Sequence, residues 1–177
     1  MSNKYIPLSL LACLLFPSCG CIKNSNVNSI EPNTVCFIDS CVVKALSDSI
    51  CNIITNADSI TIARLKIKGD TISETDRKKL NTYESTLVNY IVTTPGYYQT
   101  NVPVYGLFFP QIEVSYKHKE EAISMRYDLS LKKWYAYNNS GSELCGFDIS
   151  DSSMLRFSSI IFPNDTLLET LLTLPSK

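Results

Sequence analysis

Histidine is almost missing from this sequence, which has one, His118, among 177 residues. A Ser-His-Asp or Cys-His catalytic site would have to use that residue, because the chain offers no other imidazole. His118 lies in the segment Tyr116-Lys-His-Lys-Glu-Glu121, whose charges are typical of a solvated hairpin turn. A general base needs a partner and a pocket, so we expect His118 to take no part in catalysis.

Other signatures of chemistry are missing as well. The six glycines form no phosphate-binding loop, and the chain has no Gly-x-Ser-x-Gly nucleophile motif. The spacing Cys36-x4-Cys41-x9-Cys51 matches no zinc pattern. Basic and acidic residues number 16 and 17, and no basic patch indicates a nucleic-acid partner. We therefore expect no metal, no cofactor, no catalytic residue and no bound nucleic acid.

The longest apolar stretch near the start, Tyr5 to Phe16, is too short for a membrane span, which needs roughly 20 apolar residues. It follows Met1-Ser-Asn-Lys4 and precedes Pro17-Ser-Cys-Gly-Cys21. A short basic start, an apolar core and a small residue before a cysteine resemble a bacterial lipoprotein signal. Over residues 1–21, this resemblance implies cleavage after residue 18 and acylation of Cys19 by fatty acids such as palmitate.

Two other cysteines compete with Cys19 as the lipid anchor. Cys13 follows a better local match, Leu10-Leu-Ala12, but its apolar run is very short. Cys21 follows Gly20, but Ser18 is a poor residue three places upstream. Cys21, rather than Asp, lies two residues after Cys19, so the resemblance implies a lipoprotein on the periplasmic face of the outer membrane. An ordinary cleaved signal with free export is the alternative.

Residues 19–35 are rich in Asn and Ser without any periodicity, which predicts a flexible tether. Residues 36–177 then form a single domain. Its four cysteines, Cys36, Cys41, Cys51 and Cys145, would reach an oxidising compartment, where disulfides form. Four cysteines permit three pairings, and we expect Cys145 to pair with one of the other three.

Hydrophobic spacing in residues 36–177 predicts the order α-β-α-β-β-β-α-α. The first predicted elements are a helix from Asp39 or Ser40 to Asn56, a strand at Ser59–Lys68 whose alternation switches near Arg64, and a helix that begins at the capping-box pattern Ser73-x-x-Asp76 and ends at Thr94. Three strands between Gln111 and Asn138 and a loop with Glu143, Cys145 and Asp148 follow. The last two helices begin at Ser150 or Asp151 and at Asn164 or Asp165. The three strands alternate cleanly and form an antiparallel meander. An apolar sheet face under amphipathic helices indicates an α+β two-layer domain with an antiparallel sheet of about four strands.

Aromatic residues concentrate between Tyr97 and Phe109, and Tyr97, Tyr98 and Tyr105 are those we expect to face outward. Tyrosine offers broad contact area at a small entropic cost, which is typical of binding surfaces. The alternative is that these rings cover an open edge of the core. The sequence favours a non-catalytic, lipid-anchored envelope protein that binds another protein or a ligand, with an inhibitor or immunity-type protein as one variant. A hydrolase of envelope polymer is the alternative from another class, and the sequence leaves the partner and the oligomeric state open.

Overall fold

The computed structural model describes residues 38–97, 107–138, 143–148 and 152–174, the third of these ranges through its backbone alone. The chain divides into two units, Met1–Val35 and Cys36–Lys177, and every described residue belongs to the second. The elements are α1 (Ser40–Leu46), α2 (Asp48–Thr55), β1 (Ser59–Lys68), β2 (Thr71–Lys79), α3 (Thr82–Thr93), η1 (Pro95–Tyr97), β3 (Ile112–His118), β4 (Glu121–Asp128), β5 (Lys133–Asn138), β6 (Glu143–Asp148), α4 (Ser153–Ile161) and α5 (Thr166–Thr173).

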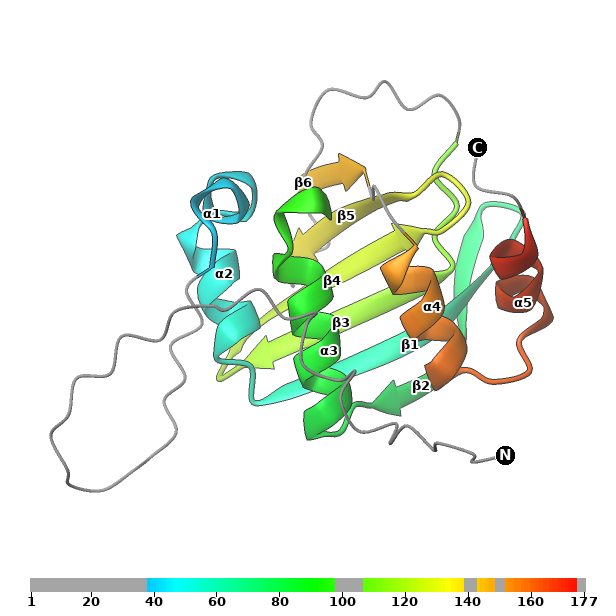
Figure 1. Ribbon diagram of the computed structural model, residues 1–177, viewed down its shortest axis with the longest axis horizontal. Helices are drawn as coiled ribbons and strands as arrows, with labels where there is room; N and C mark the ends of the chain where they lie inside the picture. The colour runs from blue at the N-terminus through cyan, green and yellow to red at the C-terminus, as the bar shows by residue number, and fades with distance from the viewer. Residues whose placement is uncertain (1–37, 98–106, 139–142, 149–151, 175–177) are drawn as a thin grey trace, which may run out of the picture. The chain divides into compact units, whose positions relative to one another are not determined.

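The strands form one antiparallel sheet in the order β2-β1-β3-β4-β5-β6. Figure 1 shows α2, α3 and α4 across one face of this sheet, which confirms the predicted α+β class with its helical layer. The predicted meander is β3-β4-β5. The sheet has six strands instead of about four because β2 and β6 extend it at its two edges. Among the described residues, no helix has the length and apolar character that a membrane span requires.

The core lies between the sheet and the helices. Alternation along β3 and β4 places every second side chain on the covered face, as a half-buried antiparallel strand requires. Those positions are fully or almost fully buried, and the covering helices contribute the matching apolar side chains: Ile112, Val114, Tyr116, Ile123, Met125 and Tyr127 from the strands, and Val42, Leu46, Ile54, Val88 and Met154 from the helices. Burial of this kind supplies the main driving force for folding.

The first predicted helix is divided in two. Asp39 caps α1 as expected, because its side chain accepts a hydrogen bond from the backbone N–H of Cys41 at 2.8 Å. Ser47 then takes a positive φ of 73°, which ends α1 and begins α2. The break lets both Val42 and Ile54 reach the core from differently directed helices.

The prediction that a helix begins at Ser73-x-x-Asp76 is wrong, because Thr71–Lys79 is the edge strand β2. All nine of its residues are exposed, and its backbone pairs with β1 from Lys68 back to Thr61. The capping box that does begin α3 is formed by Asn81 and Glu84, each accepting a hydrogen bond from the backbone N–H of the other.

Two further details concern the strands. The irregularity predicted near Arg64 is confirmed, since the register of β1 against β2 shifts between Arg64 and Leu65. The segment Glu143–Asp148, predicted as a loop, is the strand β6 and pairs with β5.

Candidate functional site

Most residues singled out from the sequence lie outside the described part of the chain. Tyr98, Tyr105 and the candidate anchors Cys13, Cys19 and Cys21 are among them. Tyr97 ends the short helix η1, and only its backbone is described. The aromatic binding surface expected from these tyrosines therefore stays a prediction.

The cysteines of the domain are partly described. Cys41 is exposed on α1 and Cys51 is buried on α2, and both are free thiols. Burial, with a smaller contribution from Asp48, raises the pKa of the Cys51 thiol. Cys145 pairs with Ala136 in the β5-β6 ladder, and Cys36 lies outside the described residues. Any disulfide of the domain thus stays a prediction.

His118 is the last residue of β3, and its side chain is 18% exposed. It is therefore more buried than the solvated turn residue we expected. Its Nδ1 atom lies 3.6 Å from Oδ2 of Asp58, the same carboxylate oxygen that accepts the backbone N–H of Lys119 at 2.7 Å. This arrangement ties the start of β1 to the β3-β4 turn. Among the described residues, no group of three or more His, Cys, Asp or Glu side chains could hold a metal ion.

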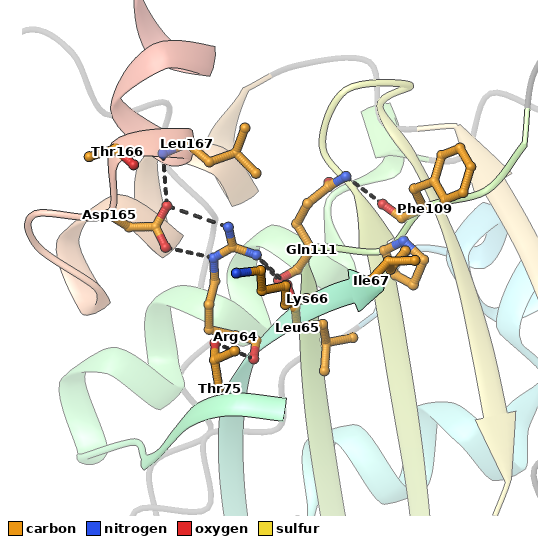
Figure 2. Close-up of a pocket in the computed structure, with 11 residues that line it drawn as sticks. Arg64, Leu65, Lys66, Ile67, Thr75, Phe109, Gln111, Asp165, Thr166 and Leu167 are labelled. Atoms are coloured by element: carbon orange, nitrogen blue, oxygen red, sulfur yellow. Dashed lines mark hydrogen bonds and ion pairs between the residues drawn. The ribbon is translucent and has the colours of Figure 1, made fainter. Parts of the chain in front are cut away.

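A pocket of about 560 Å³ lies at the end of the sheet where β1 runs past β3. We call it the hairpin-end pocket, because the β1-β2 hairpin forms one of its walls. A second wall is the segment that leads into β3, and a third is the start of α5, as Figure 2 shows. The lining residues are Arg64, Leu65, Lys66, Ile67, Thr75, Phe109, Pro110, Gln111, Asp165, Thr166 and Leu167. Its size falls within the usual range of ligand sites, about 300–1,000 Å³.

The floor of this pocket is an ion pair between Arg64 and Asp165. Nε of Arg64 donates to Oδ2 of Asp165 at 2.7 Å, and the side chains are 12% and 22% exposed. The same guanidinium donates to the backbone carbonyls of Leu65 and Gln111. Asp165 also caps α5 by accepting the backbone N–H groups of Leu167 and Leu168 at 3.1 and 3.0 Å. These bonds engage both charged groups within the protein, so they hold the pocket together.

The pKa of the Asp165 carboxyl group agrees with this structural role. Partial burial acts to raise the pKa of its carboxyl group. The hydrogen bond from Arg64 and the backbone N–H of Leu168 outweigh it, so the pKa lies below its usual value. Asp165 therefore stays ionised near neutral pH and keeps α5 attached to β1.

The rim of the pocket is apolar and exposed. Phe109 is 46% exposed and Leu167 is 41% exposed, although both are large hydrophobic residues. Ile72, also 41% exposed, pairs directly with the lining residue Ile67 across the β1-β2 ladder. Three separate parts of the chain thus bring exposed apolar side chains to one end of the sheet, and such gathering marks interaction sites.

The sheet face opposite the helices carries a second group of charges. Glu113 is buried and accepts from Nε of Arg126 at 2.8 Å and from Nη2 of Arg77 at 3.4 Å. The guanidinium of Arg126 also lies over the ring of Tyr137, with 5.1 Å from Cζ to the ring centre. Nε of Arg77 also donates to Glu74 at 2.9 Å, so two carboxylates balance the two guanidinium groups. The group therefore stabilises the strands and offers a ligand little free charge.

The sequence did not single out the hairpin-end pocket. Its walls come from residues 64–67, 109–111 and 165–167, and no local pattern connects them. No family model matches the chain, and no curated protein or solved structure shows significant similarity to it. The site must therefore be read from its own geometry.

Proposed function

We propose that this protein is a non-catalytic, lipid-anchored envelope protein whose α+β domain binds a protein partner at the hairpin-end pocket. The lipid anchor rests on the lipoprotein-like residues 1–21, with Cys19 as the acylated residue. The observation that carries the binding role is the apolar rim of Phe109 and Leu167, exposed at a pocket of ligand size, with the exposed Ile72 beside the lining residue Ile67.

The hydrogen bonds of the charged residues in the pocket favour a role in binding over a role in catalysis. Arg64 and Asp165 are bonded to each other and to the backbone. The pocket therefore offers a partner the apolar side chains of Phe109 and Leu167 at its rim and the ammonium group of Lys66, which is exposed. Aromatic side chains that fill such pockets are frequent anchors of protein interfaces.

Site-specific photo-crosslinking tests this proposal. A benzoylphenylalanine side chain placed at Phe109 in the full chain should give a discrete crosslinked adduct in envelopes of cells that make the protein. Placed at Tyr83, which is 72% exposed on α3, the same group should give none. An additional Leu167→Asp substitution should abolish the adduct at position 109, because it puts a charge on the rim of the pocket.

The two positions are matched, since both carry an exposed aromatic side chain. Equal adducts at positions 83 and 109 would show that crosslinking is non-specific. No adduct at position 109 would contradict the proposed binding site.

A further inference from the structure

The β1 strand has an open edge inside the hairpin-end pocket. β1 contains ten residues, but its ladder with β3 covers Ser59 to Arg64. The backbone N–H of Leu65 still donates to the carbonyl of Gln111 at 2.8 Å. After that bond the two segments separate, because Gln111 and Phe109 are held to β4 by Tyr127 and Asp128.

Strand geometry identifies which backbone groups face the opening. The carbonyl of Lys66 is directed to β2, where it accepts the hydroxyl of Ser73 at 3.1 Å. Neighbouring residues of a strand direct their N–H and C=O groups to opposite sides. The N–H and C=O of Ile67 therefore point away from β2 and toward the pocket, whereas those of Leu65, on the same side, already bond to Gln111 and Arg64. In the described ranges no strand pairs with Ile67 on that side.

The side chains along this edge alternate in character. Leu65 and Ile67 are apolar and lie on one face of the strand, whereas Lys66 and Lys68 are basic, exposed and lie on the other. The other charged residues that line the pocket, Arg64 and Asp165, are already paired with each other. A complementary strand would place apolar residues beside Leu65 and Ile67 and acidic residues beside the lysines.

We infer that the partner inserts an extended segment of alternating apolar and acidic residues beside residues 66–68 of β1, pairing with the backbone of Ile67 and adding a strand to the sheet within the pocket. This mode of recognition obtains affinity from backbone hydrogen bonds and specificity from alternate side chains. The inference rests on the proposed function for the presence of a protein partner. Phe109 and Leu167 would contact the inserted segment from the two other walls.

A synthetic peptide tests the inference directly. The probe is fluorescein-labelled Val-Glu-Val-Glu-Val-Glu, measured by fluorescence anisotropy against the unacylated full chain with Cys13, Cys19 and Cys21 changed to Ser. We expect saturable binding, and no binding of Val-Lys-Val-Lys-Val-Lys. The variant Lys66→Glu/Lys68→Glu should bind the acidic peptide about tenfold more weakly and should now bind the basic peptide. Lys79→Glu/Lys117→Glu, which reverses two exposed strand lysines that do not line the pocket, should behave as the parent does.

Backbone pairing is tested with two N-methylated probes. A strand donates hydrogen bonds from alternate residues on each edge. One probe is methylated on its Val amides and the other on its Glu amides. Only one of the two sets faces β1, so one probe should lose binding and the other should still bind. Equal effects of the two would overturn strand addition, as would the absence of a charge swap in the lysine variant. If the protein instead binds phosphatidylglycerol vesicles and not the peptide, and loses vesicle binding in Lys66→Glu/Lys68→Glu, that result would overturn strand addition in favour of a lipid surface.

The two proposals fail separately. Adducts at position 109 in cells with no peptide binding would leave the interaction module standing and refute strand addition. Peptide binding with the charge swap, but without adducts in cells, would support strand addition and refute the proposed function.

Discussion

The ion pair between Arg64 and Asp165 allows a quantitative prediction. Asp165→Asn should remove the charge yet keep a good helix cap, because Asn accepts hydrogen bonds at this position about as well as Asp. Exposed pairs contribute about 0–1 kcal/mol, whereas breaking a buried pair costs about 3–5 kcal/mol. With side chains 12% and 22% exposed, this pair lies between these limits. We expect Asp165→Asn to lower the free energy of unfolding by about 2 kcal/mol.

Asp165→Ala also removes the cap of α5 and should lower the free energy of unfolding by about 1 kcal/mol more. The assay is urea unfolding at pH 7, followed by circular dichroism. Asp39 is the matched control, since it caps α1 through Cys41 but has no ion pair that the structure describes. Asp39→Asn should therefore change stability little. Equal losses for Asp165→Asn and Asp39→Asn, or no loss for either, would refute the role assigned to the pair.

The same pair predicts a pH dependence of known sign. The pKa of Asp165 in the folded protein is lower than its usual value, which is about 3.9 in an unfolded chain. A lowered pKa stabilises the folded state above the unfolded pKa, and this stabilisation is lost as the pH falls through the folded pKa. The stability difference between the wild type and Asp165→Asn should stay constant from about pH 7 to pH 5 and shrink below about pH 4. A difference that already declines between pH 7 and pH 5 would contradict this assignment.

Further predictions concern the sheet and the cysteines. Glu113→Gln should lower the free energy of unfolding by about 2 kcal/mol, because the buried carboxylate accepts hydrogen bonds from two arginines. Glu74→Gln, on the exposed strand β2, should lower it by less than about 1 kcal/mol in the same urea assay. Cys41 should react with a thiol reagent in the native protein and Cys51 only after unfolding, since the first is exposed and the second buried. With these two as free thiols, Cys36 and Cys145 are the pair left for a disulfide, which would stabilise the fold by about 4–5 kcal/mol on closing a loop of about 100 residues. Peptide mapping without reduction should find that pair, and a bond from Cys145 to Cys51 would contradict it.

Where one face of the sheet is covered, the sequence predicted the strands well. Strand β1 has the predicted bounds, and the strands of the meander follow from alternation such as Ile112, Val114 and Tyr116. These side chains alternate because the helices cover one side of the sheet. The N-terminal cap of α5 at Asp165 was also predictable, since an Asp before an apolar run is a helix-start signal.

The edge strand β2 shows why the rest could not be predicted. Five of its nine residues are charged and one, Ile72, is a large apolar residue, so it has no hydrophobic alternation. Its conformation is imposed by the backbone of β1, which is a tertiary effect. Charges on such an edge also discourage pairing with other chains.

The hairpin-end pocket escaped prediction for a related reason. Arg64 and Asp165 are separated by 101 residues, and neither has a neighbour in the sequence that indicates the other. The bulge after Arg64 and the position of α5 decide that they meet. Phe109 was part of the aromatic segment noted in the sequence, but its exposure at this pocket depends on the hydrogen bond from its N–H to Asp128.

The central claim is that fatty acids on Cys19 hold this binding domain at a membrane. It is tested most directly by growing a bacterial host that expresses the full chain with radiolabelled palmitate and then separating its membranes. We expect label in the wild-type protein and in Cys13→Ser, both in the membrane fraction, and neither label nor membrane association in Cys19→Ser. Wild-type protein that incorporates no palmitate and fractionates as Cys19→Ser does would contradict the account.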